Sequence, residues 1–240
     1  MNIAIVGYGK MGKIIEEVAL SRGHSVDVKI DLNNLHEFNA KTFAHVDAAI
    51  EFTGPHTAFG NVMQCLEMGI PVVCGSTGWL DQLPEVAAAC TQKQGSFMYA
   101  SNFSVGVNIF FELNKQLAKL MSGQPQYDIH IKEIHHTQKK DAPSGTAITL
   151  AEQILNNHGM KSKWVNEPSK ENDELSIISE RIDPYPGWHE VNYTSGIDEI
   201  KIIHNAHSRN GFALGAVLAA EYIQDKKGIF TMKDVLGFGN

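Results

Sequence analysis

The sequence has few cysteines, no long apolar run and no excess of basic charge. Of its 240 residues three are cysteines, and none forms a CxxC pair. We therefore expect reduced, buried thiols in a cytoplasmic protein. No apolar run approaches the ~20 residues that span a bilayer, and the N-terminus lacks the basic region of a signal peptide. A formal net charge of −7 argues against a nucleic-acid or anionic-membrane partner.

The first hundred residues alternate short apolar runs with amphipathic stretches. Apolar strands that alternate with helices are typical of a parallel sheet covered on both faces. An α/β domain is therefore expected here. Its expected strands are Ile3–Val6, Ser25–Ile30, Ala48–Phe52, Val72–Cys74 and Phe97–Ala100, with helices at Met11–Ser21, Thr57–Met68 and Leu83–Gln92.

After Phe103 the pattern changes. Successive strands with few helices between them predict a mixed, mostly antiparallel sheet, and hence a second domain of α+β type. A last helix, rich in small residues, is suited to close packing. The expected helices are Gly106–Leu120, Ser144–Asn157 and Gly211–Tyr222; the expected strands are Tyr127–Thr137, Ser176–Ile182, His189–Ser195 and Glu199–Ala206; and Asn166–Glu174 is expected to be a loop.

A G-x-G-x-x-G pattern at Gly7, Gly9 and Gly12 lies between the first strand and the first helix. In a dinucleotide site the first glycine permits the tight turn and the second lets the pyrophosphate approach the backbone. The third lets helix and strand pack closely. The helix N-terminus then offers N–H groups to the phosphates. A glycine-rich turn without a ligand is the alternative, but the strand–turn–helix context favours a Rossmann-like dinucleotide-binding domain.

Asp31 ends the second strand, about 20 residues after the last glycine, where such domains place the carboxylate that binds a ribose 2′-OH. Leu32 follows it and supplies no cation for a 2′-phosphate. The sequence therefore favours NADH over NADPH, with Lys10 and Lys29 as nearby cations that could offset the preference.

Two further loops follow parallel-type strands, where ligands bind in open sheets. They are Phe52-Thr53-Gly54-Pro55 and Gly75-Ser76-Thr77-Gly78. Both could be plain turns. Their shared position favours a role in lining the cofactor site.

The segment Glu133–Ala147, EIHHTQKKDAPSGTA, carries the groups suited to proton transfer. In a strand that runs to Thr137, the adjacent His135 and His136 face opposite sides, so they are not expected to share a metal ion. Histidine exchanges protons near neutral pH, which makes this segment a candidate for acid–base chemistry. A basic, solvated strand end is the alternative interpretation.

A rigid loop at Pro143 leads into the helix expected from Ser144. The N–H groups of Gly145 and Thr146 would lie in its first turn and could bind an anion such as a carboxylate. His204 and His207 are spaced three apart, but no cysteine or carboxylate completes a zinc ligand set. We therefore expect no metal site.

Over nearly its whole length, the sequence resembles the dihydrodipicolinate reductase family. The motifs that carry the resemblance are VGYGKMG (6–12), EFTGP (51–55), CGSTGW (74–79), SNFSVGVN (101–108) and above all EIHHTQKKDAPSGTA. The resemblance implies reduction of 4-hydroxy-tetrahydrodipicolinate, by way of dihydrodipicolinate, to tetrahydrodipicolinate with NADH or NADPH. That reaction belongs to lysine and diaminopimelate biosynthesis.

The resemblance also implies roles for residues. His135 resembles the proton donor and Lys139 the second catalytic group, while His136, Gly145, Thr146 and Thr77 resemble substrate binders. The segments that match cofactor-binding segments are Gly7, Tyr8, Gly9, Lys10, Met11, Gly12, Asp31, Gly75, Ser76, Thr77, Ala100, Ser101, Asn102 and Phe103, to which the strand-end loop adds Phe52 and Thr53.

For the architecture, the resemblance implies a dinucleotide-binding domain of residues 1–104 with 211–240. Residues 105–210 would form a substrate-binding and oligomerisation domain, through which a homotetramer assembles. The sequence departs from the family between Arg181 and Val191, where two prolines in RIDPYPGWHEV replace a usual glycine-rich turn. This loop could set subunit contacts.

Two competing interpretations remain. Another dehydrogenase of the same two-domain plan, such as an aspartate or homoserine-type reductase, would need a different catalytic set, for example a reactive cysteine in a strand-end loop, for which Cys74 is the candidate. A non-catalytic NAD sensor would keep Gly7–Gly12 but would have no need of His135 and Lys139 beside a carboxylate-binding helix start.

Overall fold

The computed structural model describes residues 1–238 and divides the chain into two compact units. The first unit comprises Met1–Val105 and the chain from Arg209 onward, and the second comprises Gly106–Ser208. The divisions expected from the sequence lie within two residues of these bounds. Residues 239 and 240 of the expected first domain lie outside the described part. No helix described is long and apolar enough to cross a membrane.

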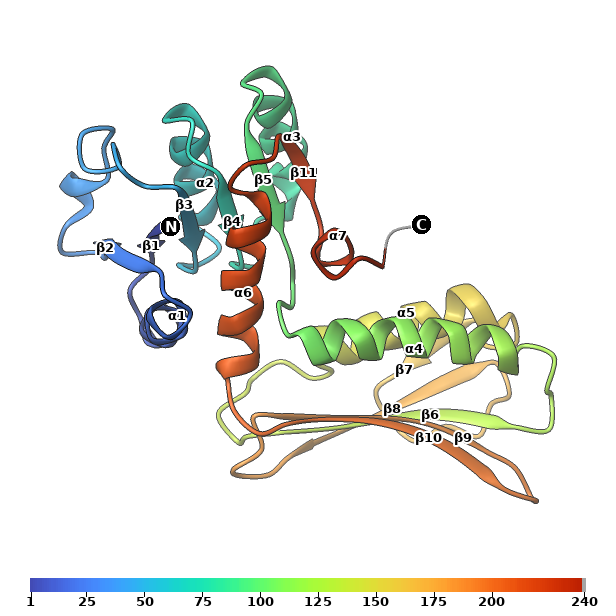
Figure 1. Ribbon diagram of the computed structural model, residues 1–240. Coiled ribbons are helices and arrows are strands. Elements are labelled where there is room, and N and C mark those ends of the chain that lie inside the picture. Colours follow the sequence, from blue (N-terminus) through green and yellow to red (C-terminus); the bar gives the residue numbers. More distant parts are fainter. Residues whose placement is uncertain (239–240) are drawn as a thin grey trace. The chain divides into compact units, whose positions relative to one another are not determined.

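A parallel sheet forms the centre of the first unit (Figure 1). Its strand order is β2-β1-β3-β4-β5-β11, and every pairing in it is parallel. The order reverses between β1 and β3, which defines the point where ligands bind in open α/β sheets. The elements are β1 (Asn2–Val6), α1 (Lys10–Ser21), β2 (Ser25–Ile30), η1 (Leu35–Glu37), β3 (Ala48–Glu51), α2 (Ala58–Glu67), β4 (Val72–Cys74), η2 (Leu80–Gln82), α3 (Leu83–Gln92), β5 (Ser96–Tyr99), α6 (Asn210–Ile223), β11 (Gly228–Phe230) and α7 (Met232–Leu236).

Helices cover both faces of this sheet, as the alternating pattern predicted. Successive residues of a strand point to opposite faces. Ile3 and Ile5 of β1 pack with α1 and α6, whereas Ala4 and Val6 pack with α2 and α3. Figure 1 shows α6, in red, running alongside the sheet although it follows the whole second unit in sequence. The core of the first unit therefore depends on both ends of the chain.

The small residues of α6 explain how closely it approaches the sheet. A Cβ atom at Gly215 would lie 1.7 Å from the carbonyl oxygen of Phe103, so only glycine fits there. The close packing expected of this helix is confirmed. β11 and α7 were not predicted from the sequence, because stretches of three and five residues are too short to show a period.

The second unit contains a mixed sheet of order β10-β9-β6-β8-β7. β10 and β6 flank β9 in antiparallel pairings, while β6, β8 and β7 are parallel neighbours. The sheet is mixed as expected, but it is not mostly antiparallel, since two of its four pairings are parallel. The parallel half arises because α5 carries the chain back from the end of β6. The elements are α4 (Val105–Met121), β6 (Asp128–His135), α5 (Gly145–His158), β7 (Lys163–Val165), β8 (Glu174–Arg181), β9 (Gly187–Thr194) and β10 (Glu199–Ala206).

Both helices of the second unit lie on one face of its sheet (Figure 1). Ile129 and Ile131 of β6 point into the core beneath α4 and α5, together with Val191 of β9. The alternate residues form the opposite face, which we call the open sheet face: Lys132, Ile134, Ile178, Trp188 and Ile203. Ile203 is exposed, and the others are half-buried.

Candidate functional site

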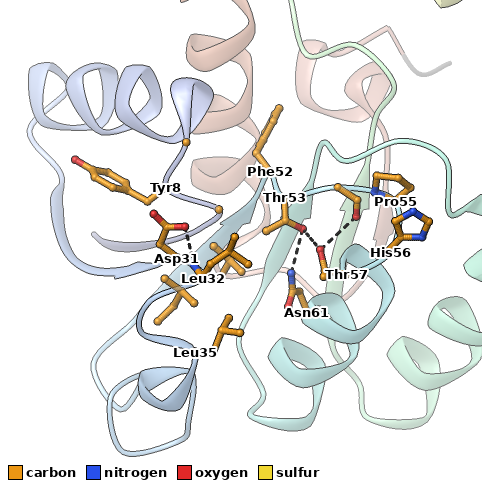
Figure 2. A pocket seen from close by; sticks show the side chains of 15 residues that line it. Tyr8, Asp31, Leu32, Leu35, Phe52, Thr53, Pro55, His56, Thr57 and Asn61 are labelled. Atoms are coloured by element: carbon orange, nitrogen blue, oxygen red, sulfur yellow. Dashed lines mark hydrogen bonds between the residues drawn. The ribbon is translucent and has the colours of Figure 1, made fainter.

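A cleft of about 400 Å³ opens where the strand order of the first unit reverses (Figure 2). It lies at the carboxyl ends of β1, β2 and β3, the place expected for a ligand in an open parallel sheet. Six of the cofactor residues predicted from sequence line it: Gly7, Tyr8, Gly9, Asp31, Phe52 and Thr53. The structure thus brings the glycine turn, the acidic strand end and the loop after β3 into one cleft.

The three glycines differ in what surrounds them. Gly7 has a φ of +102°, and a Cβ there would lie 2.4 Å from the Phe52 carbonyl oxygen. A Cβ on Gly12 would lie 2.4 Å from the Gly7 carbonyl oxygen, whereas one on Gly9 would meet nothing within 4 Å. Gly7 and Gly12 are therefore required by the fold. Gly9 instead leaves space in front of the helix N-terminus, which fits a pyrophosphate.

The edge of the cleft around Asp31 is acidic and apolar. The Asp31 carboxylate accepts the N–H of Leu32 at 2.6 Å, and the Leu32 side chain is 80% exposed. Lys29, one of the cations that could offset an NADH preference, donates to Glu16 at 2.8 Å. Glu16 also accepts the hydroxyl of Tyr8. The ammonium of Lys29 is thus engaged by a carboxylate of its own unit.

A buried carboxylate supports the loop after β3. Glu51 is fully buried and accepts the N–H of Thr53 at 2.9 Å. The Thr53 hydroxyl also donates to it and lies 2.8 Å from the hydroxyl of Thr57, while Asn61 donates to Thr53 at 3.1 Å (Figure 2). This network fixes the loop on which Phe52 and Thr53 face the cleft.

Cys74 lies against the same carboxylate. Its thiol donates to Glu51 at 2.9 Å. Burial, together with the negative charge of Glu51, raises the pKa of Cys74 far above its ordinary value. A thiolate nucleophile needs the opposite environment. The competing dehydrogenase with a reactive cysteine therefore loses its candidate.

The remaining predicted cofactor residues do not line this cleft. Gly75 lies against Phe52, since a Cβ there would be 2.2 Å from the Phe52 ring, and that ring packs 5.8 Å from the ring of Phe103. The Ser76 carbonyl accepts the indole N–H of Trp79 at 2.7 Å. Lys10, Thr77 and Ser101 are exposed, Met11, Ala100 and Asn102 are half-buried, and Gly12 is buried beneath the turn.

Sequence reasoning missed several residues of the cleft. They are Leu35, His56, Thr57 and Asn61. Thr57 and Asn61 are four residues apart at the start of α2, so they lie on one side of that helix. That spacing was available in the sequence. The position of Leu35 was not, because it depends on how the chain turns after β2.

In the second unit, a buried polar cluster surrounds the end of β6. Glu133 is fully buried, and His135 is 7% exposed. One Glu133 oxygen, Oε1, accepts the N–H of Ser144 at 3.0 Å and lies 3.3 Å from Nη2 of Arg181. The other, Oε2, lies 3.3 Å from Nδ1 of His135 and 3.6 Å from Nε2 of His189. A single carboxylate thus faces four partners.

The ionisation of this cluster follows from its contacts. Burial alone would raise the pKa of Glu133, but interactions with His135, His189 and Ser144 outweigh it, and its pKa lies well below the ordinary range. Burial lowers the pKa of His189. At neutral pH the cluster therefore holds an ionised carboxylate beside a neutral His189.

The adjacent His135 and His136 lie in different surroundings, but they do not belong to the same strand. The strand expected to run to Thr137 ends at His135, because Thr137 is held by the β8–β9 loop instead. Its N–H and hydroxyl donate to Asp183 at 3.2 and 2.7 Å. His135 is buried on the helix-covered face, and His136 is half-buried just beyond the strand.

The prolines of the unusual loop therefore belong to a segment that contacts the histidine region. Asp183 holds Thr137, and Ile182 donates its N–H to the carbonyl of His135 at 2.7 Å. A Cβ on Gly187 would lie 3.3 Å from Nε2 of His135. From the sequence, this loop was expected only to set subunit contacts. Its contacts with Thr137 and His135 were not predicted.

Lys139 and the start of α5 complete the segment. Lys139 donates to both oxygens of Asp141, at 2.9 and 2.7 Å. Although burial favours the neutral acid, this ion pair keeps the pKa of Asp141 below its usual value. Ser144 caps α5, as its hydroxyl accepts the N–H of Ala147 at 3.2 Å, and Gly145 and Thr146 stand in the first turn as expected.

No role was predicted from the sequence for Glu133, Arg181, Gly187 or His189. The alternation of a strand places Glu133 and His135 on one face, so that pair was predictable. Arg181 of β8 and His189 of β9 are brought next to this pair by the register of those strands against β6. Among the described residues, Glu133, His135 and His189 form the group whose spacing could suit a metal ion, and His204 and His207 do not belong to it.

Comparison with known proteins agrees with this architecture. A family model described as the N-terminus of dihydrodipicolinate reductase matches residues 1–103, and a model of its C-terminus matches residues 106–236. The chain belongs to the dihydrodipicolinate reductase family. The resemblance inferred from the motifs is thereby confirmed, and so is the combination of a Rossmann-like unit with a second, mixed-sheet unit.

Relatives within the dihydrodipicolinate reductase family match over most of the chain. A 4-hydroxy-tetrahydrodipicolinate reductase from Christiangramia forsetii is 50% identical, with 98% of each chain covered. One from Alkaliphilus oremlandii is 34% identical, again with 98% of each covered. The solved structure of dipicolinate-bound dihydrodipicolinate reductase from Paenisporosarcina sp. TG-14 is 22% identical, with a TM-score of 0.76 and 96% and 97% of the two chains covered. That structure shows the shared fold.

Proposed function

We propose that this chain reduces 4-hydroxy-tetrahydrodipicolinate, by way of dihydrodipicolinate, to tetrahydrodipicolinate in lysine and diaminopimelate biosynthesis. The observation that carries the proposal is the buried His135, with Glu133 behind its ring and the capped start of α5 beside it. Family membership supplies the reaction, and this cluster supplies a group able to carry a proton to a carbon of the substrate. The substrate class is a small cyclic dicarboxylate.

In this proposal NADH or NADPH supplies the hydride when bound. The cleft of the first unit fits the cofactor because Gly9 leaves open space at a helix N-terminus and Asp31 stands at the ribose position. Phe52 and Thr53 would contact it, as would the predicted residues around Gly75. NADH is the preferred form, because Asp31 repels a 2′-phosphate and Lys29 is paired with Glu16.

The second unit would bind the substrate. His135 donates the proton, and Lys139 is the second catalytic group, whose positive charge attracts a carboxylate. Gly145 and Thr146, in the first turn of α5, would receive a carboxylate, since a helix start favours negative charge. His136 is a further proposed substrate contact in this unit, and Thr77, which belongs to the first unit, is another.

Assembly and location belong to the same proposal. The open sheet face carries Trp188 and Ile203 beside the Lys132–Glu180 ion pair of 2.8 Å, a mixed surface suited to contact between subunits. We propose that a homotetramer forms through it. A cytoplasmic location is supported by the free, buried thiols of Cys65, Cys74 and Cys90.

A coupled assay tests the proposed function. The purified protein is mixed with NADH and the product of dihydrodipicolinate synthase, generated in place from pyruvate and aspartate semialdehyde. We expect NADH oxidation that depends on every component of the synthase reaction. NADH turnover with unrelated keto acids, and none with the synthase product, would refute the assignment.

A further inference from the structure

Glu133 connects the parts of the second unit to which the proposed function assigns the substrate. Its Oε2 faces Nδ1 of His135, and its Oε1 accepts the N–H of Ser144, the residue that caps α5. Arg181, whose Nη2 lies 3.3 Å from Oε1, also donates to the carbonyl of Asp141. His135, the helix start and the Lys139 loop are therefore all held through one side chain.

The geometry also defines the two nitrogens of His135. Nδ1 lies 3.3 Å from Oε2 of the Glu133 carboxylate, which can only accept, so the contact favours a proton on Nδ1. Nε2 lies at the other end of the ring, where a Cβ on Gly187 would come within 3.3 Å of it. Only Nε2 is then left to give up a proton. The ring that remains is the neutral form with hydrogen on Nδ1.

We propose that Glu133 is the positioning residue of the reaction: it holds the His135 ring with Nδ1 protonated, so that Nε2 delivers the proton, and it fixes that ring relative to the start of α5. This inference rests on the proposed function for the step that it serves. The arrangement of protons is a property of the protein alone. Glu133 does not touch the substrate and acts through His135 and Ser144.

The other charged groups around His135 fit this assignment. His189 approaches the same Oε2 from β9, at 3.6 Å, but burial keeps it neutral, and its Nε2 also lies 3.2 Å from the Ser144 hydroxyl. From β8, Arg181 shares Oε1, and on β10 the half-buried His204 faces His189. Glu133 is thus the carboxylate that faces Nδ1 of His135.

Glu133→Gln is the sharpest variant, since it keeps the shape and removes the charge. The glutamine carbonyl would face the two donors, Ser144 N–H and Arg181, which leaves its NH₂ group towards His135. A protonated Nδ1 would then face another donor, so the doubly protonated ring is disfavoured. Glu174→Gln is the matched control. Glu174 lies at the other end of β8, where it pairs with Lys163 at 2.9 Å.

Three measurements are made on wild type, Glu133→Gln and Glu174→Gln. We expect kcat of Glu133→Gln to fall on the order of 10- to 100-fold, less than the loss from removing the imidazole itself. The descending limb of its pH–kcat profile should move to lower pH. Its Kd for NADH should stay within about twofold of the wild-type value. Nitrogen-15 NMR of labelled histidine, assigned with His135→Ala, should show hydrogen on Nδ1 of neutral His135 in wild type and on Nε2 in Glu133→Gln.

The outcomes separate the possibilities. A wild-type His135 with hydrogen on Nε2 overturns the inference, and this result requires no turnover and no folded Glu133→Gln protein. If Glu133→Gln lowers only the melting temperature and leaves kcat and the pH–kcat profile unchanged, the Glu133 carboxylate is purely structural, and this result also overturns the inference. Stoichiometric zinc in the purified wild type, lost in Glu133→Gln, would replace it by a metal site. Failure of the coupled assay with the expected spectra would refute the proposed function alone.

Discussion

The two candidate sites of this protein are built from different materials. The cleft of the first unit is arranged around backbone features, which are close-packed glycines, strand ends and a helix N-terminus, with the side chains of flanking loops along its edge. The cluster of the second unit is formed by buried side chains that share one carboxylate, Glu133. A backbone site suits a ligand that must be held, and a site of titratable side chains suits a proton that must be moved.

The largest expected effect tests the second of these sites. His135→Ala and Lys139→Ala should each lower kcat in the coupled assay, by about 10²- to 10⁴-fold for the removal of a proton donor. The Kd for NADH should hold, because none of the cleft residues is changed. His45→Ala and Lys170→Ala, at exposed positions, are the controls. Loss of NADH binding in either active-segment variant would show that the two roles are not separate.

The converse test changes the backbone site. Gly9→Ala should raise the Kd for NADH by roughly tenfold or more, because the new methyl group enters the space left for the pyrophosphate. The melting temperature should fall only slightly, because this methyl group meets no protein atom within 4 Å and alanine is merely a poorer N-cap for α1 than glycine. Gly60→Ala, which also meets nothing within 4 Å, should leave the Kd unaffected and, because Gly60 lies in α2, should raise the melting temperature. An unchanged Kd for Gly9→Ala would place the phosphates elsewhere.

Cofactor choice offers a smaller effect at the edge of the same cleft. Leu32→Arg should raise kcat/KM for NADPH relative to NADH by about tenfold, since a charge-assisted hydrogen bond contributes ~1.5–3 kcal/mol. Steady-state kinetics with both cofactors measure the ratio. Leu20→Arg, an exposed position on α1, should leave it unaltered. A wild type that prefers NADPH would contradict the role given to Asp31.

The smallest expected effect is on stability. Burial lowers the pKa of His189 in the folded protein, so on acidification the unfolded chain binds a proton first, near pH 6.5. Stability from this group is therefore full above that pH and is lost as pH falls towards the folded pKa. Urea unfolding should show a slope of at most about 1.4 kcal/mol per pH unit from this residue. His189→Asn should reduce the slope, whereas an equal slope would place the effect on His158 and His204, whose pKa values burial also lowers.

The contrast between the cleft of the first unit and the buried cluster of the second also explains how much could be predicted from the sequence. Local patterns predicted the parallel sheet, the glycine turn and the capped start of α5, because each depends on residues close together in the chain. The partners of Glu133 could not be predicted, since Arg181 and His189 reach it through the register of β8 and β9 against β6. The end of β6 at His135 depended on Asp183, far along the chain. Only the family resemblance could supply the substrate.

The place of α6 in the first unit has a consequence for biosynthesis. When a ribosome has translated as far as Val105, β1 to β5 exist, but the helix that covers Ile5, Ile50 and Met98 has not been made. The second unit is continuous in sequence and can be completed first. The nascent first unit therefore keeps an apolar sheet face open until the last part of the chain emerges, and during that interval it is a target for chaperones.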